Sequence, residues 1–381
     1  MKNNLPHHTL QGPASGTPLI LGPSLGTSLH VWDPQLPALT RTHRTLRWDL
    51  PGHGGSPASL LDPTHPPRVA DLATLVLRLA DAQGWERFSY AGISLGGAVG
   101  LRLAADHPDR IDRLAVVCSA ARFGTPESWR ERADLVRAKG TATMADSRPG
   151  TWFSPAFAKT QAGQRLIEDL IATDRTAYAA ACEALAAFDI RAELPTIKAP
   201  TLVIAGRNDP ATPPASAREL ADSIPHATLL EIPEAAHLAN AERPEPVTAA
   251  LLQHFTRTPT GETVRRAVLG DAHVDRATTT TTPFTAPFQD FITRYAWGEI
   301  WTDPTLDHRT RSCITLTALT AHGHHTELAL HVRAALTNGL SRTEIGAVLL
   351  QTAVYCGVPA ANSAFAVAQR VFDELDGTNN G

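Results

Sequence analysis

The chain has 381 residues, of which 43% are hydrophobic and 19% are charged, and its formal net charge is −4. This length exceeds that of one ordinary domain, so we expect two. The small negative charge gives no reason to expect a nucleic-acid partner. No amino-terminal apolar stretch is long enough for a signal peptide or a membrane span, so we expect a cytoplasmic protein without membrane association. The cysteines form no Cys-x-x-Cys pair, so we expect free thiols and no metal: Cys118, Cys182, Cys313 and Cys356.

The amino-terminal half begins with an apolar run at residues 19–21, which predicts a buried strand. This run leads into a loop with the sequence Gly-Pro-Ser-Leu-Gly at residues 22–26. Backbone N–H groups in such a loop can stabilise the oxyanion of an acyl-transfer reaction, and we expect Leu25 to supply one of them. Residues 47–56 fit a further strand and a sharp turn, in which we expect His53 to be structural.

A Gly-x-Ser-x-Gly sequence at residues 92–96 follows a second apolar run, 88–91, and opens a helix rich in alanine, glycine and leucine. A serine at a tight turn between strand and helix is lifted off the sheet with its hydroxyl exposed. Ser94 is therefore a candidate nucleophile, and the N–H of Leu95 is the second expected oxyanion donor. The pattern alone also fits a glycine-rich loop with an ordinary hydroxyl.

Helical patterns replace strand patterns over about 122–195, which predicts a helical cap above the carboxyl ends of the strands. Guanidinium groups suit planar anions, so arginines here are candidates for binding a substrate carboxylate. A solvated helix face is the alternative for each of them. The candidates in the cap are Arg122, Trp129, Arg130 and Arg132.

Two more apolar runs, 201–206 and 228–232, are each followed by a residue that could complete a catalytic triad. Asp209 follows the first run and His237 follows the second. The order serine, acid, histidine is the one that an α/β-hydrolase requires. Taken singly, Asp209 could cap a turn and His237 could be an ordinary loop histidine. The three strand-end positions together predict a Ser94–His237–Asp209 triad.

A polar break at residues 256–261 predicts a boundary between a hydrolase domain, 1–256, and a second domain, 257–381. We expect the second domain to be entirely helical, because apolar residues recur there at helical spacing. The threonine run 278–282 is expected to be a flexible connection, and Ser341 to Glu344 form a predicted capping box. The expected helices cover about 264–270, 284–301, 308–321, 324–338, 342–356 and 360–374.

Three side chains in the second domain are spaced so as to share one helix face: His324, Glu327 and His331. Three interpretations stay open from the residues alone. They could form an acid-base cluster, a metal site, or a polar subunit interface without chemistry. We expect His322 and His325 to point elsewhere.

Specific strings in both halves resemble known families. Residues 10–256 resemble the 3-oxoadipate enol-lactonases through Ser24-Leu25-Gly26-Thr27, the segment 48–56, the sequence around Ser94, and Arg122-Phe123-Gly124-Thr125. Residues 261–375 resemble the carboxymuconolactone decarboxylases through the strings at 265–271, 288–291, 296–298 and 355–359. Together they resemble the fused decarboxylase–lactonase of the protocatechuate branch of aromatic catabolism.

The resemblance implies successive reactions on small lactone carboxylates without a cofactor or a metal. The helical domain would decarboxylate 4-carboxymuconolactone, with His331 as the acid and with His324 and Glu327 assisting, and the triad would hydrolyse the resulting enol-lactone. It also implies a homo-oligomer assembled through the helical domain. Two alternatives remain: a serine carboxylesterase or lactonase with a non-catalytic helical oligomerisation domain, and a hydrolase-fold binding protein without turnover.

Overall fold

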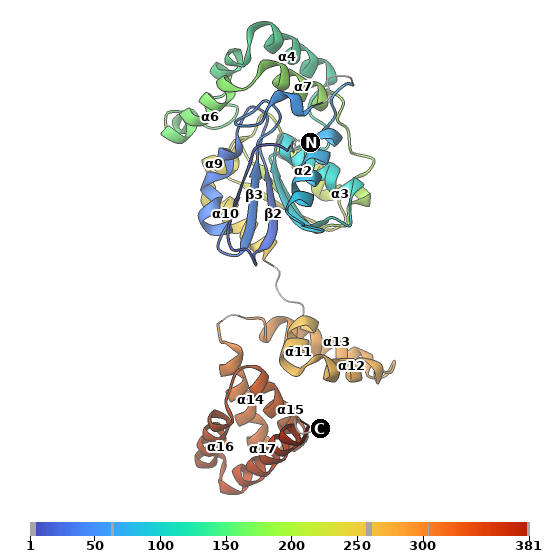
Figure 1. The fold of residues 1–381 in the computed structure, drawn as a ribbon, viewed down its shortest axis with the longest axis vertical. Coiled ribbons are helices and arrows are strands. Elements are labelled where there is room, and N and C mark those ends of the chain that lie inside the picture. Colours follow the sequence, from blue (N-terminus) through green and yellow to red (C-terminus); the bar gives the residue numbers. More distant parts are fainter. Residues whose placement is uncertain (1–4, 62–64, 257–260, 304, 379–381) are drawn as a thin grey trace. The chain divides into compact units, whose positions relative to one another are not determined.

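The computed structural model describes residues 5–61, 65–256, 261–303 and 305–378. It divides into an N-terminal unit, Met1–Thr256, and a C-terminal unit, Arg257–Gly381 (Figure 1). Four residues of the predicted boundary, 257–260, lie outside the described ranges. No helix within those ranges is both long and apolar enough to cross a membrane.

A seven-stranded sheet with the order β1-β3-β2-β4-β5-β6-β7 organises the N-terminal unit. Only the edge strand β1 is antiparallel to its neighbour, which confirms the predicted mostly parallel sheet. Every residue of β4 and β6 is buried, as expected for parallel strands that are covered on both faces. The strands are β1 (His8–Gln11), β2 (Thr17–Gly22), β3 (His43–Trp48), β4 (Phe88–Ile93), β5 (Ile111–Val117), β6 (Thr201–Gly206) and β7 (Ala227–Ile232).

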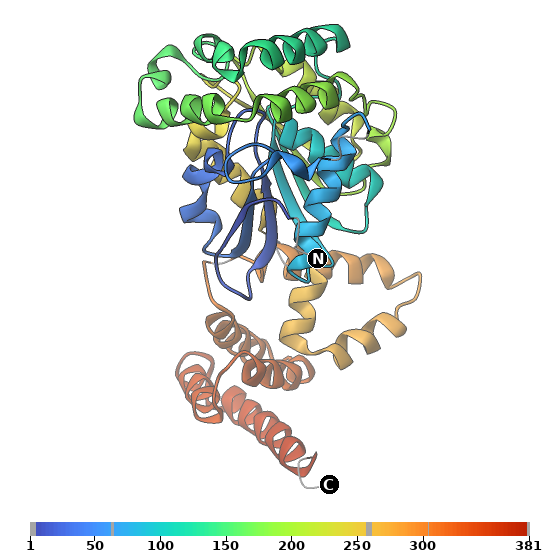
Figure 2. The same cartoon turned by 45° about the horizontal axis from the view of Figure 1, so that its top comes forward.

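Helices flank the two faces of this sheet, with α2 and α3 on one side and α9 and α10 on the other (Figure 1). They are α1 (Leu36–Leu39), α2 (Val69–Ala82), α3 (Leu95–Asp106), α8 (Pro214–Ser223), α9 (Ala239–Glu242) and α10 (Pro244–Phe255), with short 3₁₀ helices η1 (Leu29–Gln35), η2 (Ala58–Leu60) and η4 (Leu194–Thr196). A helical cap lies across one end of the sheet (Figure 2). It consists of α4 (Pro126–Lys139), η3 (Thr141–Ser147), α5 (Pro155–Ala158), α6 (Gln161–Ala172) and α7 (Arg175–Ala186).

The described part of the C-terminal unit is helical, with an apolar core that includes Leu316, Leu328, Val332 and Leu349. Its helices are α11 (Gly261–Leu269), α12 (Asp271–Thr279), α13 (Ala286–Phe291), the π-helix η5 (Ile292–Ile300), α14 (His308–His322), α15 (His325–Thr337), α16 (Arg342–Cys356) and α17 (Val358–Thr378). The predicted capping box is present at the start of α16. The expectation for the threonine run was wrong at its start, because Thr278 and Thr279 form the last turn of α12.

The turn between β4 and α3 depends on close backbone packing at Gly96. A Cβ on this residue would lie 2.6 Å from the carbonyl carbon of Gly22 in β2. Backbone atoms in a central strand cannot move away as a flexible side chain could. Any side chain at position 96 would therefore push the nucleophile turn off the sheet.

We expect Gly96→Ala to lower the free energy of unfolding by about 3 kcal/mol, because the added methyl group overlaps main-chain atoms. Chemical denaturation followed by tryptophan fluorescence measures this change. The control is Gly84→Ala, where no atom lies within 4 Å of the added Cβ and the positive φ of 70° alone costs about 1 kcal/mol. Equal losses in the two variants would contradict the packing argument.

Candidate active sites

Ser94 lies between β4 and α3 with φ 56° and ψ −117°, outside the regions that non-glycine residues ordinarily occupy. Two contacts hold this backbone. The Ser94 N–H donates to the carbonyl of Val117 at 2.9 Å, and Ser119 Oγ donates to the Ser94 carbonyl at 2.8 Å. Because hydrogen bonds hold both the N–H and the carbonyl of Ser94, the strained backbone cannot relax and the hydroxyl keeps a fixed position.

The structure brings the three predicted triad residues together in hydrogen-bonding order. His237 Nε2 lies 2.9 Å from Ser94 Oγ, and His237 Nδ1 lies 2.8 Å from Asp209 Oδ2. All three side chains are buried. The arrangement fits a histidine that accepts the serine proton while the carboxylate fixes its tautomer.

Thr212, which the sequence reasoning missed, anchors the acid. Its hydroxyl donates to Asp209 Oδ2 at 2.7 Å, and its N–H donates to Asp209 Oδ1 at 3.0 Å. Burial opposes ionisation of Asp209, but His237 and these Thr212 bonds outweigh it and hold the pKa of Asp209 below its ordinary value. An aspartate bonding to the N–H groups two and three residues later is a common turn signal, which could have revealed Thr212.

The loop after β2 is anchored through the backbone of Gly26. The Gly26 N–H donates to His53 Nε2 at 3.0 Å, and His53 Nδ1 contacts the Pro51 carbonyl at 2.9 Å. Burial lowers the pKa of His53 to about 4, so the ring is neutral and carries its proton on Nδ1. In the described chain, the N–H groups of Leu25 and Leu95 have no protein acceptor. They are therefore available for an oxyanion.

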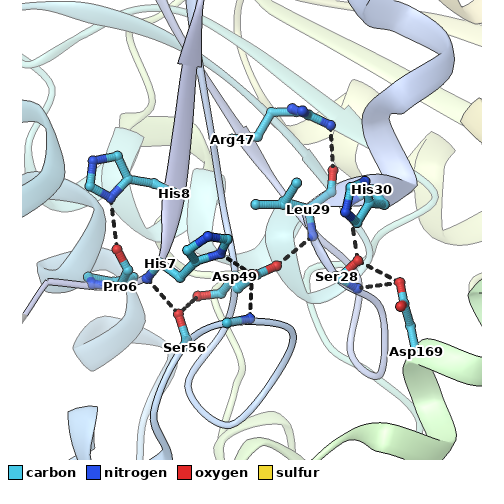
Figure 3. Close-up of polar contacts among 11 residues, drawn as sticks. Pro6, His7, His8, Ser28, Leu29, His30, Arg47, Asp49, Ser56 and Asp169 are labelled. Atoms are coloured by element: carbon cyan, nitrogen blue, oxygen red, sulfur yellow. Dashed lines mark hydrogen bonds and ion pairs between the residues drawn. The ribbon is translucent and has the colours of Figure 1, made fainter.

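Asp49, a buried carboxylate, fixes the far end of the same loop. It accepts hydrogen bonds from the N–H of Leu29 at 2.6 Å and from that of Gly55 at 2.9 Å. Figure 3 shows its contact with His7, whose Nδ1 lies 2.7 Å away, and the neighbouring Ser56 hydroxyl that donates to the Asp49 carbonyl. These contacts join the loop after β2 to the turn after β3.

Hydrogen bonds also attach the cap to the two catalytic loops below it. Asp169 of α6 accepts the hydroxyl of Ser28 at 2.5 Å (Figure 3). On the other side, the Leu238 N–H donates to the Trp152 carbonyl at 2.7 Å. Glu242 accepts from the N–H of Ala236 and from that of Ser154 in the cap. The loops carrying the oxyanion donors and His237 are both held to the cap.

A cavity of about 240 Å³ opens above Ser94 and His237. Its cap wall contains two arginines stacked on aromatic rings: Arg132 lies 4.4 Å from the Trp129 ring and Arg148 lies 5.2 Å from the Trp152 ring. Tyr178 also lines the cavity, and burial raises its pKa to about 12 against the effect of both arginines. The hydroxyl of Tyr178 is therefore protonated at neutral pH.

The structure corrects part of the expected carboxylate site. Trp129 and Arg132 line the cavity, but Arg122 and Arg130 do not. Both of the latter are exposed, and Arg130 pairs with Glu127 at 3.6 Å. Arg130 lies in α4, whereas Arg122 precedes this helix and forms a β-bridge with Asp189.

Arg148 is the cavity arginine that the sequence reasoning missed, because the irregular segment around η3 has no usable periodicity. It is 6% exposed and donates to the Met144 carbonyl and to Ser147 Oγ. No carboxylate of the described residues forms an ion pair with it. Burial lowers its pKa and the nearby charge of Arg132 adds to this effect, so an anion in the cavity would stabilise the charged guanidinium.

In the C-terminal unit the predicted cluster is only partly assembled. Glu327 and His331 lie one turn apart in α15, but the expectation for His324 was wrong. Gly323 adopts a left-handed conformation that ends α14, so His324 precedes α15 as its N-cap. Its ring stacks on His322, with 6.0 Å between the centroids. His322, which we expected to point away from the cluster, is thus the neighbour of His324.

His331 is half-buried and stacks on Trp301, with ring centroids 6.5 Å apart. Burial lowers the pKa of His331, His273 of α12 lowers it further, and Glu327 partly offsets both. The sequence reasoning missed His273 because it missed α12. Among the described side chains, no group of three or more His, Cys, Asp or Glu residues could hold a metal ion.

Comparisons with known proteins agree with this division into two sites. Residues 17–244 match the α/β hydrolase fold family, and residues 286–370 match the carboxymuconolactone decarboxylase family. The chain is 36% identical to 3-oxoadipate enol-lactonase 2 of Acinetobacter baylyi over 61% of this chain and 86% of that protein. It is 42% identical to the 4-carboxymuconolactone decarboxylase of the same organism over 30% of this chain and 86% of that protein.

A solved structure supports the first match. The crystal structure of the enol-lactonase from Burkholderia xenovorans LB400 superposes with a TM-score of 0.63 at 38% identity, covering 66% of this chain and 96% of that one. Both matched groups are enzyme families. The chain therefore belongs to the α/β-hydrolase fold family through its N-terminal unit and to the carboxymuconolactone decarboxylase family through its C-terminal unit.

Proposed function

We propose that the chain is a bifunctional enzyme of protocatechuate catabolism. Its C-terminal unit decarboxylates 4-carboxymuconolactone to 3-oxoadipate enol-lactone, and its N-terminal unit hydrolyses the enol-lactone to 3-oxoadipate. The observation that carries this proposal is a hydrogen-bonded triad beneath a cationic pocket, joined in one chain to a decarboxylase-family unit. The product of one reaction is the substrate of the other.

In the hydrolytic step, Ser94 Oγ attacks the lactone carbonyl while His237 accepts its proton. The N–H groups of Leu25 and Leu95 stabilise the developing oxyanion. The ring oxygen leaves as an enol, which demands less of the general acid than an alkoxide would. Water activated by His237 then releases the acid from Ser94, and the enol tautomerises to the ketone.

The enol-lactone carries an acetate side chain, and Arg148 supports the binding of its carboxylate. A buried guanidinium without a carboxylate partner gains a charge-assisted hydrogen bond when this group enters the cavity. Arg132, stacked on Trp129, supplies a second positive charge at the same wall. Guanidinium groups held on aromatic rings keep a fixed geometry, which favours orientation of a small substrate.

In the decarboxylation step, the electrons of the breaking carbon–carbon bond pass through the ring alkene into the lactone carbonyl. The resulting dienolate is then protonated at the carbon next to the carbonyl. Protonated His331 supplies this proton, and Glu327 stabilises its charged form. The Trp301 ring against His331 shields the site from water. No organic cofactor takes part in this step.

We also propose that the enzyme is cytoplasmic and forms a homo-oligomer through its C-terminal unit. Large apolar side chains are exposed there on α14 and α16, including Ile314, Leu350 and Tyr355. Exposed large apolar side chains gathered on two packed helices are typical of an interface between subunits. A second copy of the same unit would cover it.

Ser94→Ala should retain decarboxylation and lose at least roughly 10⁴-fold in lactone hydrolysis, because among the described residues only the Ser94 hydroxyl bonds His237 Nε2. Ultraviolet and product assays on 4-carboxymuconolactone should then show the enol-lactone accumulating. Ser59→Ala, on the exposed helix η2, is the matched control and should behave as wild type. Normal lactone clearance by Ser94→Ala would refute the nucleophile, and no release of carbon dioxide by either protein would favour an esterase with a non-catalytic helical unit.

Arg148→Met should raise KM for the enol-lactone by about 30-fold with a smaller change in kcat, since it removes a charge-assisted contact with the side-chain carboxylate. Steady-state hydrolysis of the enol-lactone and of its neutral methyl ester measures the effect, which should disappear with the ester. Arg130→Met removes an exposed arginine outside the cavity and should leave KM unchanged for both the enol-lactone and its methyl ester. If the wild type had a similar KM for the enol-lactone and for its methyl ester, this assignment would be contradicted.

His331→Gln should lower decarboxylation by about 100-fold or more, because the proton donor is lost. In the wild type, the pKa of His331 lies below 6.5. Its charged form is therefore depleted as pH rises, and kcat/KM for decarboxylation should fall through a midpoint below 6.5. The variant should show no such transition, whereas His325→Gln at the exposed start of α15 should retain it. A profile unchanged by His331→Gln would show that another group titrates.

A further inference from the structure

Arg265 is a buried cation in the C-terminal unit that none of the steps above uses. Its side chain lies in α11 and the residue is 7% exposed. Nη1 donates to Thr293 Oγ1 of the π-helix η5 at 3.1 Å. Nε is buried and has no hydrogen-bond partner. The guanidinium is thus held in place with one of its donors unsatisfied.

No carboxylate of the described residues forms an ion pair with Arg265. Burial lowers its pKa, and Glu262 only partly opposes this effect. The carboxylate of Glu262 instead bonds Arg266 at 3.0 Å, and Arg266 also pairs with Asp271 and Asp275. Leaving a buried charge unpaired is costly, so the position of Arg265 is best explained by an anion that binds there.

The surroundings of Arg265 connect it to His331. Helix α11 packs on η5 and α15, where Val264, Val268, Trp297 and Ala334 form a small apolar core. Trp297 packs against Trp301 at an interplanar angle of 36°, with 5.1 Å between their centroids, and Trp301 is the ring that contacts His331. Arg265 itself is tied to η5 through Thr293, and its charge acts on His273, which in turn acts on His331. A π-helix is itself rare and frequently lies at a functional site.

His273 of α12 adds a neutral donor to this group, and α11 and α12 are neighbours in the fold (Figure 1). Burial lowers the pKa of His273, and the charges of Arg265 and Arg276 lower it further. A neutral imidazole beside a guanidinium can donate one N–H without adding repulsion between cations. Such a pair suits an anion with two oxygen atoms.

We propose that Arg265, assisted by His273, binds a carboxylate of the decarboxylase substrate beside His331. The inference rests on the proposed decarboxylation. Of the two substrate carboxylates, the bound one is the acetate side chain, which is retained in the product. A cation on the carboxylate that leaves as carbon dioxide would stabilise the charge that must move into the ring, and so would slow the reaction.

The first test uses the full chain and measures release of carbon dioxide from 4-carboxymuconolactone. Arg265→Gln should lower kcat/KM at least 100-fold, mainly through KM, and Arg265→Lys should recover part of this loss because it restores the charge. Arg370→Gln removes an exposed arginine of α17 and should stay within twofold of the wild type. Hydrolysis of isolated enol-lactone should be unchanged in all three variants. Full decarboxylase activity in Arg265→Gln would overturn the proposal.

A second test avoids dependence on turnover and on the folding of the variants. The saturated lactone dicarboxylate lacks the alkene that accepts the electrons, so it can bind without reacting. Calorimetry with Ser94→Ala/Arg148→Met protein, which lacks the anion contact of the N-terminal cavity, should show this compound binding at least 30-fold more tightly than its methyl ester at the acetate group. Equal affinities would overturn the proposal. Tight, ester-sensitive binding without release of carbon dioxide by wild-type protein would instead refute the decarboxylase function and leave the anion site standing.

Discussion

The main chain of Ser94 is held at positive φ, and the chemistry of the N-terminal unit depends on this one constraint. The strain persists because main-chain atoms at Gly22 and Gly96 pack directly against one another and leave the turn no room to relax. The hydroxyl is thereby fixed over the ends of the strands that carry Asp209 and His237. The adjoining loop after β2 is held equally firmly by neutral His53 and buried Asp49, so the proposed oxyanion donors are placed before any substrate arrives.

Both units also place an arginine in the protein interior, and no carboxylate of the residues that the structure describes forms an ion pair with it. Arg148 and Arg265 contrast in this respect with Arg266, which is surrounded by acidic side chains on the surface. Surface pairs of that kind contribute little to stability, whereas an unpaired buried cation costs free energy until an anion binds. The two proposed reactions have substrates that carry the same acetate group. In both proposals, the same feature, a guanidinium held in place before the substrate binds, recognises this acetate group.

The parts of this account that sequence predicts best are those fixed by local rules. Ser94, Asp209 and His237 follow apolar strands, and the carboxyl ends of parallel strands necessarily meet at one edge of a sheet. The cap arginines could not be assigned in this way, since tertiary packing decides which helix face covers the pocket. Arg148 was therefore missed in favour of Arg122 and Arg130. Helix α12 was missed because its threonine-rich end lacks an apolar period, whereas the stop at Gly323, which separates His324 from α15, was a readable signal.

The most direct test of the central claim is a time course of the full-length wild-type chain acting on ¹³C-labelled 4-carboxymuconolactone, followed by nuclear magnetic resonance. We expect equal final amounts of carbon dioxide and 3-oxoadipate, with the enol-lactone appearing as an intermediate and then disappearing. Carbon dioxide without 3-oxoadipate would contradict the assigned lactonase. An unconsumed substrate would contradict the assigned decarboxylase and, with it, the idea that one chain carries out both successive steps.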